Sequence, residues 1–413
     1  MLLRVSRAGL LAGVFFACAP FGAAMLQSPP AQAQDALRPV VGKPLQKAQA
    51  LAKAGKFPAA MEQIDIAERA RDKTANESFV IDEMRASVAQ QSGDFKSAIG
   101  ADDVLLKSGR VPAAEQQRLL MAEASSYYQM RDYAGTIAAI DRYHKAGGAS
   151  PALETLLIQC YYLQKDYVRA AAVQNAQIQA ELKARQTPPE AQLQLLANCQ
   201  LQSRDTSGLD HTMTLLVTYY PKPEYWAQLM QGLRANPNVP DRLQFDIDRL
   251  RLDVGLLTST QDFMDMAEMA VQDGLPNQGL AVMNKGYATG ALGRDAQAPR
   301  EARLKALVDK TVAEKKASIA TDEASARSQP NGNALLAVGY SYVDLGQYPK
   351  GIAVMKEAIA KGGLLNPEDA QLHLGLAEMA AGDKAAAGST LQGVSGTDGA
   401  ADIAQLWLLR MKA

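Results

Sequence analysis

The stretch Leu335–Ala358, which reads LLAVGYSYVDLGQYPKGIAVMKEA, decides the fold class of this 413-residue chain. Large apolar and aromatic residues recur three or four positions apart on both sides of Gly346-Gln347-Tyr348, as they do along one face of an amphipathic helix. A glycine between two such runs is typical of a helix end. The pattern predicts a pair of short helices, with Gly339 facing the second helix at close range.

The turn of this hairpin recurs along the chain as a short motif. It reads AGKFPAA, SGDFKSA, MRDYAGT, QKDYVRA and SRDTSGL before the LGQYPKG of the opening stretch. The fourth residue of each copy is called the turn residue here. The first five turn residues are Phe57, Phe95, Tyr133, Tyr167 and Thr206, which are 38, 38, 34 and 39 positions apart. Because one hairpin cannot bury its apolar face alone, this near-constant spacing predicts hairpins that stack on one another.

These units resemble the tetratricopeptide repeat. The best match consists of Leu335, Val338-Gly339, Tyr342, Gly346-Gln347-Tyr348, Gly351, Met355 and Ala358. A second match consists of Leu374-Gly375, Gly382-Asp383 and Ala387. The resemblance covers nearly all of residues 43–395 except Ala298–Arg327. It implies an all-α fold, a right-handed superhelical solenoid of stacked antiparallel helix hairpins.

Five segments are expected along the chain. They are residues 1–33 as a signal peptide, 34–258 as N-terminal repeats, 259–297 as a further hairpin, 298–332 as a long charged helix with its turn, and 333–413 as C-terminal repeats with a capping helix. Ala298–Arg327 alternates charges and lacks a turn signal, which predicts one long, mostly exposed helix. The capping helix is Ala400–Lys412, which carries Trp407.

The N-terminus has the pattern of an export signal. Arg4 and Arg7 precede the uncharged apolar run Ala8–Ala19, which is shorter than the roughly 20 residues that span a bilayer. The small residues of Ala31-Gln32-Ala33 predict cleavage after Ala33 and a periplasmic mature protein. Two alternatives remain open, a retained membrane anchor and a lipoprotein modified at Cys18.

Composition and motifs argue against several functional classes. The chain has 43 Lys and Arg against 44 Asp and Glu, a balance unlike that of proteins that coat nucleic acid or anionic membranes. The three histidines are far apart in sequence, and neither a CxxC nor an HExxH pair occurs, so no zinc site is expected. Asp246, Asp248 and Asp253 lie on a polar helical run and are expected on a solvated face. We expect no cofactor and no enzymatic activity.

Two cysteines follow the signal segment, Cys160 and Cys199, at equivalent places in successive hairpins. In an oxidising compartment they could pair as a disulfide. The favoured interpretation is two small buried residues, because equivalent points on packed helices lie about 8–10 Å apart at the axes.

The first helices of such hairpins line a concave wall, and counting back from the turn residues selects the side chains on it. The candidate partner-binding residues are Ser125, Tyr128, Gln129, Gln159, Tyr162, Asn198 and Gln202. Amide side chains both donate and accept hydrogen bonds, which suits an extended peptide. Tyr128 and Tyr162 are either anchors for a partner or core residues, as Tyr127 and Tyr161 are expected to be. Of the lysine-and-arginine clamp that the family uses for carboxylate tails, only Arg118 lies near a suitable place.

Two functions follow from this resemblance. The first is an exported, non-catalytic scaffold that binds a protein or peptide partner through the concave wall. The second is a structural or assembly subunit of a cell-envelope complex. The passages VTYYPKPEYWAQL (217–229) and FMDMAEMAVQDGLPNQGLAVMNKGYATGALG (263–293) resemble periplasmic repeat proteins, some of which accompany TonB-ExbB-ExbD-type systems. Repeat packing alone would also require such passages.

Overall fold

The structure is a computed structural model that describes residues 36–235, 239–294 and 296–412. Within these residues the chain forms twenty α-helices and one short 3-10 helix, and no strand. The expected signal segment, residues 1–33 with Cys18, lies outside the described residues. No helix in the described part of the chain is both long and apolar enough to cross a membrane. The chain divides after Leu209 into two compact units, which are described separately.

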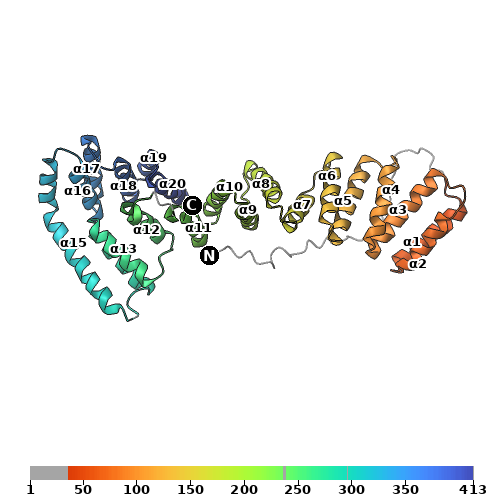
Figure 1. Ribbon diagram of the computed structural model, residues 1–413, viewed down its shortest axis with the longest axis horizontal. Coiled ribbons are helices and arrows are strands. Elements are labelled where there is room, and N and C mark those ends of the chain that lie inside the picture. The colour runs from red at the N-terminus through yellow and green to blue at the C-terminus, as the bar shows by residue number, and fades with distance from the viewer. Residues whose placement is uncertain (1–35, 236–238, 295, 413) are drawn as a thin grey trace. The chain divides into compact units, whose positions relative to one another are not determined.

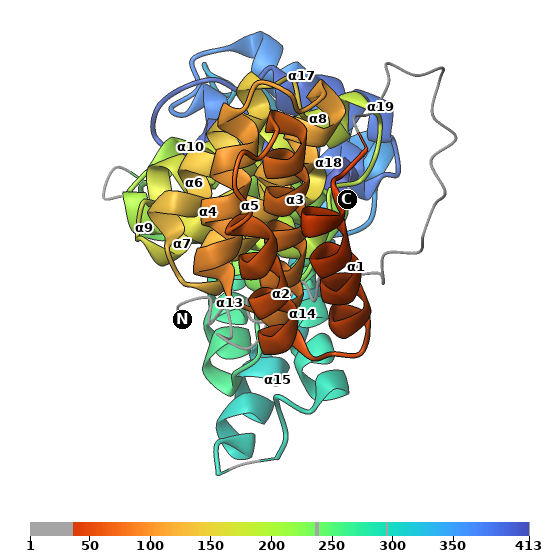
Figure 2. The ribbon, with the colours of Figure 1, turned by 90° about the vertical axis from the view of Figure 1, so that its right-hand side faces the viewer.

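Unit 1 is a row of helix pairs, which Figure 1 shows from α1 to α9 and Figure 2 shows from its α1–α2 end. Its helices are α1 (Pro39–Lys53), α2 (Phe57–Glu68), α3 (Ala75–Ser92), α4 (Phe95–Lys107), α5 (Ala113–Gln129), α6 (Tyr133–Lys145), α7 (Pro151–Leu163), α8 (Tyr167–Lys183) and α9 (Glu190–Ser203). Helix α10 (Thr206–Tyr219) contains the boundary between the units. Each helix of unit 1 packs on its neighbours in sequence, as a stack of hairpins requires.

Unit 2 is built on the same plan with two departures. Its helices are α11 (Pro223–Ala235), η1 (Asp241–Leu243), α12 (Gln244–Asp253), α13 (Thr260–Gln272), α14 (Pro276–Thr289), α15 (Ala298–Arg327), α16 (Asn333–Asp344), α17 (Tyr348–Lys361), α18 (Pro367–Ala380), α19 (Lys384–Gln392) and α20 (Ala400–Lys412). The pairs α13–α14, α16–α17 and α18–α19 are hairpins. The first departure is α15, a single long helix over the range expected. The second departure is the short α12, which contacts both α13 and α20. The expected all-α architecture of paired, stacked helices is confirmed.

The repeated turn motif has a direct physical explanation. In all five turns of unit 1 the residue two places before the turn residue has a positive φ, from 59° at Arg131 to 77° at Gly93. In four of these turns the next residue is an aspartate that caps the following helix, as Asp132 does by accepting a hydrogen bond from the amide of Gly135 at 2.9 Å. A left-handed residue followed by an N-cap therefore ends one helix and starts the next within two residues.

Close contact between two helices explains Gly339 and Gly351 in the stretch Leu335–Ala358. A Cβ added at Gly339 would lie 2.7 Å from Cγ and 2.8 Å from the backbone N of Met355 on α17. A Cβ at Gly351 would lie 2.7 Å from the backbone N of Val343 on α16. The two glycines thus face each other's helices, which confirms the close approach expected for Gly339.

Candidate functional site

The candidate site lies on the first helices of unit 1, where side chains of successive hairpins bond to each other. Tyr128 on α5 donates its hydroxyl hydrogen bond to Oε1 of Gln159 on α7 at 2.9 Å. Tyr162 on α7 donates in the same way to Oδ1 of Asn198 on α9 at 3.1 Å. In both cases a tyrosine five residues before one turn residue reaches the amide eight residues before the next. We call these two bonds the tyrosine–amide ladder.

The tyrosine rings are held within their own hairpins. The rings of Tyr128 and Tyr133 lie 6.0 Å apart at 56°, and those of Tyr162 and Tyr167 lie 5.4 Å apart at 75°. Both Tyr128 and Tyr162 are half-buried, and burial raises the pKa of Tyr128 above its ordinary value. They are neither fully exposed anchors nor core residues. Each joins its own turn to the next hairpin and stays partly exposed.

The remaining candidates separate into two groups. Ser125 bonds back to the carbonyl of Met121 in its own helix at 2.9 Å, so its hydroxyl is engaged locally. Gln129 and Gln202 are exposed, and Leu163, which holds the equivalent place on α7, is 50% exposed. We call Gln129, Leu163 and Gln202 the exposed row. Its members lie four residues before the turn residues Tyr133, Tyr167 and Thr206, and their side chains are exposed on the predicted wall.

Two further expectations concern residues near this wall. Arg118 forms an ion pair with Glu115 on its own helix. The side chain that lies near the place of a carboxylate clamp is therefore already bonded within the protein. Tyr127 packs against α6, where a Cβ added at Gly135 would lie 2.4 Å from its ring. Tyr161 is partly buried beneath the guanidinium of Arg169, whose Cζ lies 5.0 Å from the ring centre.

Both cysteines of the described chain are unpaired and buried. Burial raises the pKa of each thiol, Cys160 and Cys199, to about 12. A thiol in this state is a poor nucleophile, because the thiolate is the reactive form. The favoured interpretation of two small buried residues fits this geometry.

Two of the three aspartates predicted on a solvated face contradict that prediction, whereas Asp253 is exposed as expected. Asp246 and Asp248 are only 1% and 6% exposed. Oδ2 of Asp246 lies 2.8 Å from Nε2 of His373 on α18, and Arg249 is bonded to the Asp246 carboxylate. Burial opposes ionisation of Asp246, but His373 and Arg249 outweigh it and hold the pKa of Asp246 below its usual range. Periodicity could not reveal this, because His373 lies 127 residues further along the chain.

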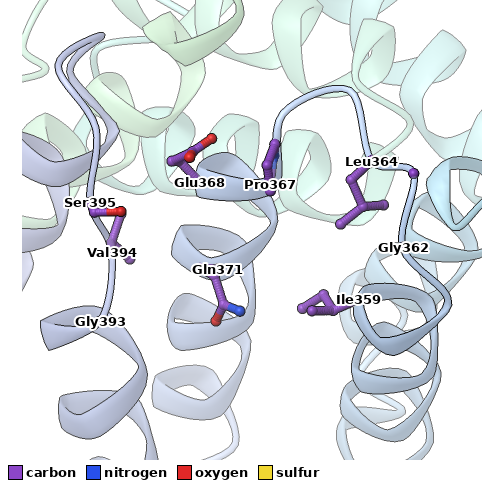
Figure 3. Close-up of a pocket in the computed structure, with 10 residues that line it drawn as sticks. Ile359, Gly362, Leu364, Pro367, Glu368, Gln371, Gly393, Val394 and Ser395 are labelled. Carbon is purple, nitrogen blue, oxygen red and sulfur yellow. The ribbon is translucent and has the colours of Figure 1, made fainter.

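Two hollows occur on unit 2. One, of about 320 Å³, lies between the α17–α18 and α19–α20 loops, and its lining includes apolar Ile359 and Leu364 and a single carboxylate, Glu368 (Figure 3). The other, of about 440 Å³, lies between α12 and α13 and is lined mainly by acidic and amide side chains. Among the described residues no group of histidine, cysteine and carboxylate side chains is arranged to hold a metal ion.

Comparison with known proteins agrees with the repeat pattern. The tetratricopeptide repeat family matches residues 336–398, which cover the α16–α17 hairpin except for the first three residues of α16 and the whole α18–α19 hairpin. The search of curated proteins finds no match. Among solved structures, the chain is similar to one in Naa15/Naa10 bound to HypK-THB, with 15% identity and a TM-score of 0.32, covering 89% of this chain and 59% of that one. It therefore spans about three fifths of that chain's length. It is also similar to yeast Tom70, with 9% identity and a TM-score of 0.24, covering 90% of this chain and 95% of that one.

Proposed function

We propose that the protein is a non-catalytic scaffold that binds a protein or peptide partner along the exposed row of unit 1. The observation that carries the proposal is the tyrosine–amide ladder, whose two tyrosines directly precede Gln129 and Leu163 in sequence. The ladder bonds Tyr128 to Gln159 and Tyr162 to Asn198, so it holds successive first helices in fixed register. A surface held in this way loses little conformational freedom when a partner binds.

The chemistry of the exposed row suits an extended peptide. Gln129 and Gln202 each offer an amide that can donate to a carbonyl and accept from an N–H group. Leu163 lies at the equivalent place between them and offers apolar area, and the half-buried tyrosine rings add amphipathic surface. We therefore expect a largely uncharged peptide segment with at least one apolar side chain.

Site-specific crosslinking tests this proposal. A photoreactive residue at Leu163, which is 50% exposed on α7, is expected to crosslink the partner in cells. The matched control is Val168, which is 67% exposed on the second helix α8 and outside the exposed row. The partner's capture is expected to fall at least tenfold when Gln129, Leu163 and Gln202 are all changed to Arg. Equal crosslinking from both positions, or full capture by the triple variant, would reject this surface.

We also propose that the mature protein is periplasmic. The support is Arg4 and Arg7, the apolar run Ala8–Ala19 and the small residues before Gln34. Mass spectrometry of the protein from its native host is expected to find Gln34 as the first residue. Recovery of the chain with Met1 intact in the cytoplasm would contradict export.

The alternative proposal is a structural subunit of an envelope complex, for example one accessory to a TonB-type transport system. It is motivated by the resemblance of residues 217–229 and 263–293 to periplasmic repeat proteins. Co-purification in a stable membrane complex would favour this alternative. A monomer that binds short peptides would favour the scaffold.

A further inference from the structure

Three successive turns of unit 1 carry a basic residue in a strained backbone conformation. Arg131, Lys165 and Arg204 each stand two places before a turn residue, in the left-handed region with φ of 59°, 61° and 61°. The equivalent places in the first two turns are Gly55 and Gly93, and glycine adopts this conformation freely. We call Arg131, Lys165 and Arg204 the basic row.

Local interactions do not repay the strain of the basic row. Each residue follows the last turn of a first helix, where the helix dipole favours a cation. At an exposed helix end this gain is smaller than the cost of the left-handed conformation for a non-glycine residue. Strain of this kind is kept where a side chain has a use. Its recurrence at three equivalent turns indicates that the use belongs to the row.

The cations of the basic row are available to a partner. All three side chains are exposed, and no hydrogen bond or ion pair with any other described residue engages them. The aspartate that follows each cation is bonded to its own second helix instead. Asp132 accepts a hydrogen bond from the amide of Gly135 at 2.9 Å, and Asp166 pairs with the guanidinium of Arg169.

The tyrosine–amide ladder sets the spacing of the row. Tyr128 and Tyr162, which bond to the next first helix, lie three residues before Arg131 and Lys165. Packed helices lie about 8–10 Å apart, so the cations follow one another at about this interval. An extended chain rises about 3.3 Å per residue, so carboxylates three residues apart would meet successive cations. A nucleic-acid strand carries a charge about every 3.4 Å, which does not match so sparse a row.

We propose that the basic row binds an acidic segment of a protein partner, an extended stretch with a carboxylate at about every third residue. This contact goes beyond the scaffold function proposed for the exposed row and does not depend on it. The two rows are neighbours, because Gln129 and Leu163 lie two residues before Arg131 and Lys165. Exposed ion pairs are individually weak and screened by salt, so the affinity comes from the three cations together.

Titration of the purified protein with a synthetic peptide tests the proposal. The peptide has glutamate at every third position and serine between, and it is expected to bind more tightly than one with glutamine in place of glutamate. The variant Arg131→Gly/Lys165→Gly/Arg204→Gly removes all three cations and is expected to raise the Kd about tenfold. Because glycine relieves the strained turns, this variant is also expected to unfold at a higher denaturant concentration, so its lost binding would not reflect misfolding.

The matched control is Arg185→Gly in the loop after α8. Arg185 is an exposed cation with a φ of 58°, so the control relieves the same strain outside the basic row. It is expected to leave the Kd of the glutamate peptide unchanged. The proposal is overturned if the triple variant binds this peptide as tightly as wild type, if Arg185→Gly weakens binding as much, or if the glutamine peptide binds equally well.

Salt gives a second measurement that needs no folding argument. Higher ionic strength is expected to weaken binding of the glutamate peptide to wild type, and binding that does not change with salt would also overturn the proposal. The exposed row is tested separately by crosslinking from Leu163. A missing crosslink there rejects the exposed row alone, whereas an unchanged Kd in the triple variant rejects the basic row alone.

Discussion

At the scale of single residues, Gly339 shows how one absent side chain permits a hairpin. Its Cα faces the backbone of Met355, so even a methyl group would lie 2.8 Å from a backbone nitrogen. We expect Gly339→Ala to lower the free energy of unfolding by about 1–3 kcal/mol, because overpacking forces the two helices apart. The denaturant midpoint measures this loss.

A matched control for that substitution lies in the same unit. Gly388 is inside α19, and a Cβ there would meet nothing within 4 Å. Gly388→Ala is therefore expected to gain about 0.5–1 kcal/mol from helix propensity alone. If both substitutions stabilise the protein, close contact between α16 and α17 is not what requires Gly339.

Asp102 on α4 predicts a pH dependence. It is 3% exposed, and burial, followed by the charge of Glu123, raises its pKa to about 7. The folded state therefore holds this proton more tightly than the unfolded state, and its contribution to stability is lost as pH rises from about 4 to about 7. The effect is at most about 4 kcal/mol, because one pKa unit corresponds to about 1.4 kcal/mol.

The substitution Asp102→Asn tests this dependence, because the amide cannot ionise. We expect the variant to be more stable than wild type at pH 8 and close to it at pH 4. Urea midpoints at both pH values give the comparison. A stability difference between variant and wild type that stays constant with pH would show that Asp102 titrates normally.

At the scale of elements, the turns of the middle hairpins carry strain that the outer turns avoid. Arg131, Lys165 and Arg204 occupy the left-handed region where Gly93 stands in the equivalent turn. A non-glycine residue in this region costs about 1–2 kcal/mol. Replacing that residue with glycine recovers only part of this cost, because glycine also has more conformational freedom in the unfolded chain. Arg131→Gly is expected to raise the unfolding free energy by about 0.5–1 kcal/mol, measured by chemical denaturation. Gly93→Ala is expected to lower it, and the same sign for both would contradict the explanation.

The tyrosine–amide ladder makes a prediction for the contact between hairpins. Tyr128→Phe and Tyr162→Phe keep the rings and remove the two inter-repeat hydrogen bonds, so each should cost about 1 kcal/mol in thermal unfolding. Tyr133→Phe, which changes a ring in the same turn but no ladder bond, serves as the control. Equal effects from all three would mean that the ladder adds nothing to stability.

The elements also show what the sequence could and could not predict. The helix pairs and the turn positions followed from apolar spacing and the turn motif, since both depend on residues close in sequence. Counting back from the turns also selected Tyr128, Gln159, Tyr162 and Asn198, because repeats place these residues at equivalent positions of successive hairpins. It could not show that these residues bond to one another. The buried face of α12 was missed, because its charges resemble a solvated helix until partners 91 and 127 residues away are brought to it.

At the scale of the whole molecule, the described apolar clusters each lie within one unit. Leu153 belongs to a cluster of unit 1 that includes Ile140, and Leu335 belongs to a cluster of unit 2 that includes Tyr342. In a stack of repeats stability is close to a sum of local terms, so damage to one cluster should spread only to its neighbours. A single two-state unfolding transition is then not expected for the chain.

Matched core truncations test this locality. Leu153→Ala and Leu335→Ala each remove a fully buried side chain and are expected to cost about 2–5 kcal/mol in the cluster that contains them. Hydrogen exchange read by mass spectrometry should show faster exchange in α6–α8 for the first variant and in α15–α17 for the second. Amides of the other unit should keep their wild-type rates, since their own contacts are unchanged. If either variant speeds exchange throughout both units, the chain unfolds as one cooperative body and its stability is not a sum of local terms.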